Sequence, residues 1–382
     1  MGLLLPAVMR SLGSMLLFAS LLALPAFAQA EVPAAIQSKL ARGINLSFWF
    51  TYRDNPQIDP NLFRPDAADL AQLRRIGFRH VRLPFERAWI ADASNPSRVD
   101  AARAGEFMSS VERLAAQGFL VVITLTSTTD DINRMLTDKA WRDTVAALWW
   151  SLAKQLSSRV PADKLMFEVL NEPATEDAAA SVALMQTLAG AVRDAAPQHS
   201  IAVAGHKYSS VDELVTLKPF LDRNLIYTFH FYEPMNFTHQ GAYWGWPMWG
   251  KLRGLPYPSS PALVEPLLAT LDADAQPHAR YYGQQEWNRA KLAAILDKAA
   301  QWQAQNGVPV WCSEFGAIKT QMPPASRAAW LRDTRELLEQ RHIGWTHFDF
   351  SQHMGLVDGA QGQRVWNLDA VKALGLKAPD TP

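Results

Sequence analysis

Short apolar segments alternate along the chain with longer stretches in which apolar residues recur every three or four positions. The short segments are typical of buried strands, and the longer stretches are typical of amphipathic helices. The helical stretches include a weak one at 210–220 and a short one near 369–375. The eight expected strands are RGINLSF (42–48), HVRLPF (80–85), FLVVITL (119–125), KLMFEVL (164–170), SIAVAG (200–205), NLIYTFHF (224–231), VPVWCSEF (308–315) and GWTHFDF (344–350).

The apolar character of these strands is nearly continuous, which is typical of a parallel sheet covered by helices. Eight strand–helix units in succession favour a closed (β/α)8 barrel, the TIM barrel architecture, as a single α/β domain. An open doubly wound sheet is the alternative. It usually carries a glycine-rich phosphate loop after its first strand, and RGINLSFWF has no GxGxxG pattern. A long segment rich in proline, glycine and aromatic residues, 231–284, interrupts the alternation after the sixth strand.

Catalytic residues of such a barrel lie at the carboxyl ends of its strands. This rule selects a limited set of candidates, which are Trp49, Arg82, Glu86, Thr126, Ser127, Asn171, Glu172, His206, His230, Tyr232, Glu314 and residues 345–350. We expect the fourth and seventh strands on opposite sides of the barrel, so that Glu172 and Glu314 face each other across its mouth. Two opposed carboxylates suit glycoside hydrolysis, although the same pair also fits other acid–base chemistry.

Two further residues are expected to point into the barrel. Strand alternation places Glu168 on the same side as Glu172 but deeper, where a buried carboxylate needs a partner such as Arg42 or Arg82. We therefore expect Glu168 to be structural. Cys312 lies two residues before Glu314 and is expected to point inward as a small buried hydrophobic residue.

Composition narrows the function further. Lys and Arg (37) balance Asp and Glu (37), so no global field favours nucleic acid or an anionic membrane. The one cysteine excludes an internal disulfide. The chain has no HExxH pattern, no paired Cys–His spacing and no GxSxG elbow, so neither a metal site nor a serine nucleophile is expected. No cofactor is implied.

The first 30 residues have the pattern of a secretory signal peptide. Arg10 precedes the apolar stretch SLGSMLLFASLLALPAF, and AFAQA offers small-residue cleavage sites after Ala28 or Ala30. A retained anchor is the alternative, but the stretch is short for a spanning helix and contains Pro25. We expect cleavage, with residues 31–382 forming one catalytic domain in the periplasm or extracellular space and no membrane attachment afterwards.

Five motifs of the chain resemble those of a known family. The chain resembles glycoside hydrolase family 5, the cellulase family of the clan whose two catalytic glutamates follow strands four and seven. The similarity spans residues 42–358 and rests on five motifs in order, which are RGINL, LRRIGFRHVRLPFERAW, FEVLNEP, FHFYEP and VPVWCSEFGA. The NEP triplet alone is a weak signal, but five motifs in order at expected strand ends are specific.

The resemblance implies roles for the strand-end residues. Glu172 would be the general acid/base, which requires burial and an opposed negative charge to keep its proton near neutral pH. Glu314 would be the nucleophile, held ionised by hydrogen bonds from Arg82 and Tyr232. The family retains anomeric configuration, so we expect the two carboxyl groups roughly 5 to 5.5 Å apart.

The remaining implied contacts concern the substrate. Asn171 would bond the sugar 2-hydroxyl, and His230 would orient the acid/base or a sugar hydroxyl. The chain departs from the family at two places. The third strand lacks the usual histidine, and the eighth strand has Phe348, with Trp345 three residues earlier, where a tryptophan platform is usual. These departures put common cellulose cleavage in doubt more than catalysis.

The long segment after the sixth strand contains YEPMNFTHQGAYWGWPMW, in which Trp244 and Trp246 are candidates for a substrate wall. Packing of these aromatic residues onto the barrel is the alternative. The expected substrate is a β-linked glucan polysaccharide or oligosaccharide, cleaved internally by a monomer. Alternatives are a β-mannanase, an exo-β-1,3-glucanase, or a catalytically silent barrel that only binds polysaccharide.

Overall fold

The computed structural model describes residues 31–380 except 54, 56, 57, 60 and 61, together with residue 2. The expected signal peptide therefore lies outside the described residues. Among the described residues, no helix combines the length and apolar character needed to cross a bilayer.

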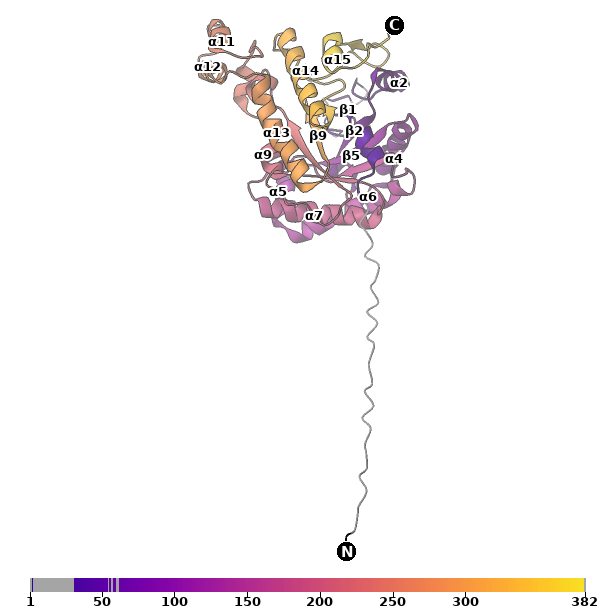
Figure 1. Cartoon of the computed structure of the whole chain (residues 1–382). Coiled ribbons are helices and arrows are strands. Elements are labelled where there is room, and N and C mark those ends of the chain that lie inside the picture. The colour runs from indigo at the N-terminus through magenta and orange to yellow at the C-terminus, as the bar shows by residue number, and fades with distance from the viewer. Residues whose placement is uncertain (1, 3–30, 54, 56–57, 60–61, 381–382) are drawn as a thin grey trace.

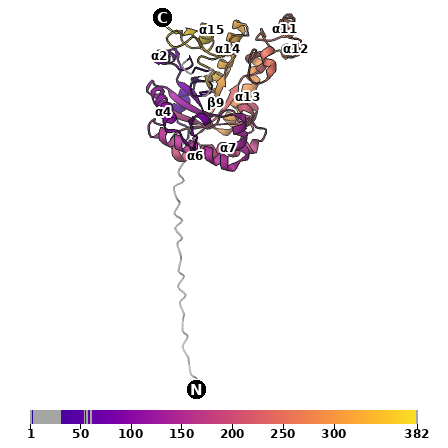
Figure 2. The same ribbon diagram turned by 180° about the vertical axis from the view of Figure 1, so that it is seen from behind.

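Eight parallel strands close into a barrel, which confirms the predicted (β/α)8 fold. Helices surround it, and the two views in Figures 1 and 2 show them on its outer side. The barrel strands are β1 (Arg42–Asn45), β2 (His80–Glu86), β5 (Leu120–Thr126), β6 (Leu165–Glu168), β7 (Ile201–Ala204), β8 (Leu225–Phe231), β9 (Val310–Phe315) and β10 (Gly344–His347). All eight fall within the segments expected from the sequence, to within one residue.

The larger helices follow the expected stripes. They are α2 (Ala67–Ile76), α4 (Ala101–Ala116), α6 (Lys139–Ser157), α7 (Ala178–Ala195), α13 (Arg289–Asn306), α14 (Pro324–Gln340) and α15 (Leu368–Ala373). Local chemistry sets their ends. Asp66 and Asp69 form a capping box at the start of α2, and Gly307 ends α13 in the left-handed region at φ 61°.

Smaller elements were not expected from the sequence, apart from the weak helix at 210–220. They are α1 (Ala34–Lys39), α3 (Arg87–Ile90), the hairpin β3 (Ala91–Asp92) and β4 (Asn95–Val99), α5 (Thr129–Thr137), α8 (His206–Ser209), α9 (Val211–Leu214), and the pair β11 (Val357–Asp358) and β12 (Val365–Trp366). The weak helix shortens to α9.

The long segment after β8 is ordered by four short helices, α10 (Met235–Thr238), the 3-10 helix η2 (Pro247–Lys251), α11 (Pro261–Leu268) and α12 (Gln276–Gln284). In both views α11 and α12 lie at the outer edge of the molecule, beyond the ring of barrel helices (Figures 1 and 2). The segment is therefore an elaboration on one side of the barrel.

The order of strands around the barrel corrects one expectation. Strands β6 and β9 are separated by β7 and β8 on one side and by β5, β2, β1 and β10 on the other. They are thus three positions apart and not diametrically opposite. Their carboxyl ends still border the same mouth, because all eight strands are parallel.

Two hydrophobic clusters pack against the two sides of the barrel wall. The interior cluster includes Val122, Met166, Ile226 and Trp311, and a larger cluster lies between the strands and the helices. Gly43 shows how tightly the interior fits, because a Cβ there would lie 1.9 Å from the His80 ring.

A β-bulge in β9 decides where the seventh-strand glutamate points. Phe229 of β8 pairs with Cys312, but the next residue, His230, pairs with Glu314. Ser313 is skipped, and its hydroxyl meets that of Thr228 inside the barrel. Bulges of this kind re-aim side chains near active sites.

The bulge also corrects the prediction for Cys312. The residue is fully buried as expected, but it belongs to the outer cluster that faces the helices and not to the barrel interior. Simple alternation fails here because the extra residue shifts Glu314 onto the inward side while Cys312 stays outward.

Candidate active site

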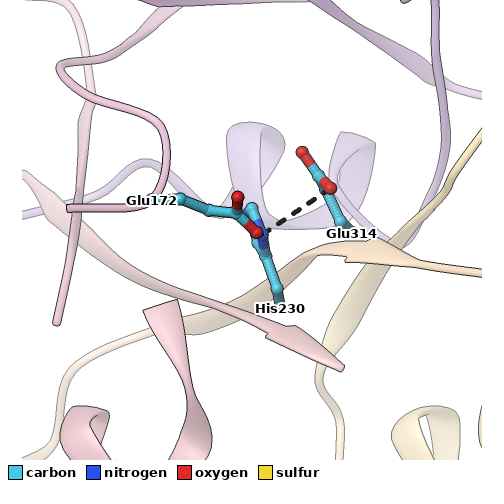
Figure 3. A group of neighbouring side chains, drawn as sticks. All are labelled: Glu172, His230 and Glu314. Atoms are coloured by element: carbon cyan, nitrogen blue, oxygen red, sulfur yellow. Dashed lines mark hydrogen bonds and ion pairs between the residues drawn. The ribbon is translucent and has the colours of Figure 1, made fainter. Parts of the chain in front are cut away.

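Three side chains from three different strand ends converge at the mouth of the barrel (Figure 3). His230 Nδ1 lies 2.8 Å from Oε1 of Glu172 and 3.6 Å from Oε2 of Glu314. One oxygen of each carboxylate and one ring nitrogen lie within 4.8 Å of one another. The nearest carboxylate oxygens therefore lie close enough to fit the short separation, about 5–5.5 Å, that is expected of a retaining pair.

Glu314 is held by two donors and is nearly closed off from solvent. Arg82 Nη1 donates to its Oε1 at 2.5 Å, and the hydroxyl of Tyr232 donates to its Oε2 at 2.7 Å. Burial and the neighbouring carboxylates raise the pKa of the Tyr232 hydroxyl well above its usual range, so this group stays a donor. Both donors favour the ionised carboxylate, as expected of a nucleophile.

Arg82 lies beneath the site, 1% exposed, and also donates to Asn45, Glu168 and Asn171. Its Nε donates to Oε2 of Glu168 at 2.5 Å, and its Nη2 donates to Oδ1 of Asn171 at 2.8 Å. Glu168 therefore pairs with Arg82, as the predicted structural role requires. The alternative partner, Arg42, pairs instead with Glu339 on α14.

Glu172 points into the mouth for a local reason. It lies four residues beyond the end of β6, and its backbone adopts a left-handed conformation at φ 43°, which is unusual for a residue with a side chain. A turn, and not the strand alternation assumed from the sequence, sets its direction. Strained backbone of this kind is concentrated at functional sites.

The environment of Glu172 differs from that of Glu314. Its side chain is 33% exposed, and the only hydrogen-bond partner of its carboxylate among the described residues is His230. Burial opposes a charge on this imidazole, but the adjacent Glu314 and Glu172 offset the effect and raise its pKa. His230 thus donates to Glu172, as the orienting role requires.

The two carboxylates are therefore chemically distinct. Glu314 is surrounded by cationic and hydroxyl donors, whereas Glu172 is accessible and borders the place where a leaving group would sit. Such an unequal pair can attack a carbon with one carboxylate and transfer a proton with the other. The same three residues are close enough to ligate a cation, but the guanidinium of Arg82 against Glu314 disfavours a second positive charge.

The eighth-strand aromatics divide into one residue at the site and one in the core. The Phe348 ring is half-buried and meets the Tyr232 ring edge-on, with centroids 6.5 Å apart. Trp345 is completely buried and lies against Phe315 on the helix-facing side of the sheet, bonding to Glu339. The prediction that Trp345 binds substrate is therefore wrong, because its alternation places it outside the barrel.

The two tryptophans of the long segment lie in different places. Trp244 is 37% exposed and packs against His353, on the loop that follows β10. Trp246 packs edge-on against His278 of α12, so it belongs to the outer elaboration. Both are partly exposed, and neither has a recorded contact with the catalytic carboxylates among the described residues.

Sequence reasoning missed Tyr52, and it gave no role to Asp349, which lies within the candidate range 345–350. Tyr52 is 51% exposed, but desolvation of its hydroxyl, and then neighbouring Glu86, Tyr243 and Glu172, raise its pKa, so the hydroxyl lies near the acid/base candidate. Asp349 follows Phe348 and is fully buried against Ser47. Tyr52 follows the first strand as Asp349 follows the eighth, so strand position was an available signal for Tyr52 as well.

The candidate residues at the ends of the third and fifth strands make no contact with Glu172 or Glu314 among the described residues. Thr126 donates to the Phe85 carbonyl, and Ser127 bonds to Asp131. His206 pairs with Glu213 at 2.9 Å. The missing third-strand histidine is therefore not replaced by another group that contacts Glu172 or Glu314 among the described residues.

Comparisons with known proteins agree with this geometry. The family model of cellulase (glycosyl hydrolase family 5) matches residues 42–354. Endoglucanase 3 of Fibrobacter succinogenes is 28% identical over 376 residues, which is 92% of this chain but only 56% of the length of that relative. Endoglucanase C of Acetivibrio thermocellus is 26% identical over 338 residues, covering 81% of this chain and 91% of that protein.

Solved structures share the fold. Thermotoga maritima Cel5A in complex with cellobiose has a TM-score of 0.71 at 24% identity, covering 89% of this chain and 98% of that one. The cellulose synthase subunit Z of Clostridioides difficile has a TM-score of 0.72 at 21% identity, covering 87% and 98%. The family match spans most of the chain and includes both carboxylates. The protein belongs to glycosyl hydrolase family 5, the cellulase family, and is a glycoside hydrolase.

Proposed function

We propose that the protein is a retaining, endo-acting β-glucanase that works by double displacement. The observation that carries this proposal is the spacing of the two carboxylates, whose nearest oxygens lie within 4.8 Å with His230 between them. A short gap is typical of a retaining pair, whereas an inverting pair stands about 6.5–9.5 Å apart to admit a water. The glucan preference is supported by relatives that are named endoglucanases, such as those of Fibrobacter succinogenes and Acetivibrio thermocellus.

The first step forms a covalent intermediate. Glu314 attacks the anomeric carbon while Glu172 gives its proton to the leaving oxygen, so the glycosidic bond breaks as the glycosyl–enzyme bond forms. Asn171 supports this step, because its side-chain oxygen is engaged by Arg82 at 2.8 Å and its amide nitrogen is left for a sugar hydroxyl. The contact strengthens as charge develops in the sugar ring.

The second step releases the sugar. Glu172, now a carboxylate, takes a proton from water as the water attacks the same carbon, and Glu314 leaves in its ionised form. Arg82 and Tyr232 stabilise that leaving carboxylate. His230 donates to Glu172 and so keeps it aimed at the reacting oxygen through both steps.

The roles of the carboxylates are tested by two isosteric variants on two kinds of substrate. Glu314→Gln should lose activity on polysaccharide and on an activated aryl glycoside alike. Glu172→Gln should lose polysaccharide hydrolysis but keep rapid formation of the intermediate from the activated glycoside, whose leaving group needs no proton. Full polysaccharide activity of either variant would refute the assignment.

Stereochemistry and specificity need separate measurements. Proton NMR during hydrolysis should show the β-anomer as the first product, and an α-anomer would contradict the retaining mechanism. Initial rates on barley β-glucan, carboxymethylcellulose, mannan and laminarin separate a glucanase from a β-mannanase or an exo-β-1,3-glucanase. The expected result is highest activity on the mixed-linkage or β-1,4 glucans, with internal cleavage seen as a rapid fall in viscosity.

We further propose that the protein is exported to the periplasm or beyond the cell. The support is the signal-like sequence of residues 1–30. N-terminal sequencing of the full chain expressed in a bacterial host should give a mature protein that starts near Glu31. Recovery of the uncleaved chain in the cytoplasm would exclude export.

A further inference from the structure

A hollow lies in the segment that follows β8. The first residue of its lining is Glu233, which directly follows Tyr232. The hollow has a volume of about 340 Å³, which is within the range of ligand pockets, about 300–1,000 Å³. It lies between the segment after β8 and the connection from α12 to α13. The side chains that define this tryptophan hollow are Trp246, Trp249, Trp287, Glu233, Asn236 and Gln285.

The indoles of the tryptophan hollow are held in place by packing. Trp246 is 41% exposed, yet its ring meets Trp249 at 90° and His278 at 89°, with centroids 6.2 and 4.8 Å apart. The backbone of Trp287 exchanges two hydrogen bonds of 2.8 Å with Ser259. These aromatic faces are therefore fixed before any ligand arrives, so ordering them on binding costs little entropy.

Polar side chains lie beside the indoles in the lining of the tryptophan hollow. The carboxyl group of Glu233 accepts from the backbone N–H of Tyr232 at 3.1 Å, and burial raises its pKa. Gln285 accepts from the indole N–H of Trp287 at 3.0 Å, which leaves its amide NH2 group able to donate. Asn236 adds a second amide to the lining. The hollow thus offers both hydrogen-bond acceptors and donors beside apolar faces.

This combination selects the chemistry of the ligand. No lysine or arginine lines the hollow, so an anionic ligand would find no opposite charge there. A wholly apolar ligand would bury the carboxylate and amides without partners. A quaternary cation would suit the indoles and Glu233 but would leave both amides unused. A pyranose ring uses every group, with its C–H face on an indole and its hydroxyls on the carboxylate and amides.

We propose that the tryptophan hollow is an auxiliary carbohydrate-binding site that holds a neutral hexose unit of the polymeric substrate away from the catalytic carboxylates. The inference rests on the proposed β-glucanase function for the identity of the polymer. The hollow adjoins the strand that carries His230 and Tyr232, but its lining residues make no recorded contact with Glu172 or Glu314. It therefore adds affinity for a long chain without taking part in bond cleavage.

The test compares Trp287→Ala and Trp246→Ala with a matched control, Trp150→Ala. Trp150 is a similarly exposed indole, 46%, on α6. Each substitution is made in the active protein and in the Glu314→Gln background. The active forms are assayed on an aryl cellobioside, which fills only the catalytic centre. The inactive forms are assayed for affinity to barley β-glucan by gel electrophoresis with polysaccharide in the gel.

The expected result is a loss of about three- to tenfold in polymer affinity for the two hollow variants, with unchanged aryl cellobioside turnover and no effect of Trp150→Ala. Unchanged polymer affinity would overturn the proposal. So would an equal loss on both substrates, because the hollow would then belong to the catalytic cleft or to the fold. Competition by tetramethylammonium chloride and not by cellohexaose would identify a cation site instead.

A different measurement tests the proposed β-glucanase function. If the unsubstituted protein does not hydrolyse the aryl cellobioside or any of the glucans, the β-glucanase assignment is wrong. Binding of the polysaccharide to the inactive forms remains measurable in that case, so the two ideas are judged separately.

Discussion

The Nδ1 atom of His230 lies 2.8 Å from Oε1 of Glu172. The contact joins the end of β8 to the turn beyond β6, and it fixes the accessible carboxylate relative to Glu314. The other ring nitrogen, Nε2, is buried and has no hydrogen-bond partner among the described residues. Nearly all of the orienting effect of the imidazole is therefore exerted through Nδ1.

Replacing His230 by Gln should reduce kcat on polysaccharide by about ten- to a hundredfold, a part of the 10²–10⁴ that acid–base catalysis contributes. The loss should be much smaller on an aryl glycoside whose leaving group needs no proton. Steady-state rates on both substrates check this. His206→Gln, which breaks a pair with Glu213, is the control and should leave the ratio of the two rates unchanged. A parallel loss on both substrates would argue for a purely structural histidine.

Arg82 should be essential to stability as well as to activity, because it lies between two buried carboxylates. Arg82→Met leaves Glu168 and Glu314 without their cation and should lower the free energy of unfolding by about 3–5 kcal/mol. Urea denaturation measures this.

The double variant Arg82→Met with Glu168→Gln should recover part of the lost stability, because it removes one of the two uncompensated charges. If the two substitutions were simply additive, the ion pair between Arg82 and Glu168 would carry no coupling energy. Neither variant should regain activity, because Glu314 still lacks its guanidinium donor.

The buried carboxyl group of Asp349 should make the free energy of unfolding depend on pH. Burial raises the pKa of this carboxyl to about 7, although Ser47 and the backbone N–H of Gln352 donate to it. The folded protein therefore keeps a proton that the unfolded chain releases above about pH 4. The free energy of unfolding should fall as pH rises from about 4 to 7.

The isosteric variant Asp349→Asn should remove this part of the pH dependence, while its Oδ1 still accepts from Gln352 and its NH2 can donate to the Ser47 hydroxyl. Denaturant midpoints at several pH values between 4 and 8 would show it. An equally steep fall in the variant would assign the effect to another buried carboxyl group, such as Glu233, whose pKa is also raised by burial.

The eighth strand offers a matched pair of aromatic substitutions. Phe348→Ala should lower kcat/KM by about two- to tenfold, because it removes an apolar face beside Tyr232, with little change in stability. Trp345→Ala should cost about 3–5 kcal/mol of unfolding free energy through the cavity it leaves. A loss of substrate affinity in folded Trp345→Ala protein, with Phe348→Ala unaffected, would reverse the assignment.

Two glycine substitutions test the packing of the barrel interior. Gly43→Ala would place its Cβ 1.9 Å from the His80 ring, which is held by Lys39 and Thr346, so it should destabilise by about 1–3 kcal/mol or more. Gly190→Ala on α7 meets nothing within 4 Å and should stabilise by up to about 1 kcal/mol. Thermal denaturation of both compares them directly, and equal midpoints would show that the interior yields to the extra methyl group.

The arrangement of the candidate site was largely predictable from the sequence, because strand position and motif spacing both select Glu172 and Glu314. Parallel strands place their carboxyl ends at one mouth whatever the details of packing. The contacts of Arg82, Tyr232 and His230 were likewise predicted and are present. Errors arose where a local irregularity broke strand alternation, as with Cys312 beside the bulge in β9.

The alternation of apolar strands and amphipathic stripes by itself determined the eightfold barrel, its order of elements and the candidates at its mouth, because hydrophobic periodicity is a local property. Tertiary structure decided which way individual side chains point. The bulge turned Glu314 inward, the turn at φ 43° aimed Glu172, and strand pairing placed Trp345 outside the barrel. It also gathered Trp246, Trp249 and Trp287 from separate parts of the chain into one hollow. Such contacts join residues distant in sequence, so no local pattern encodes them.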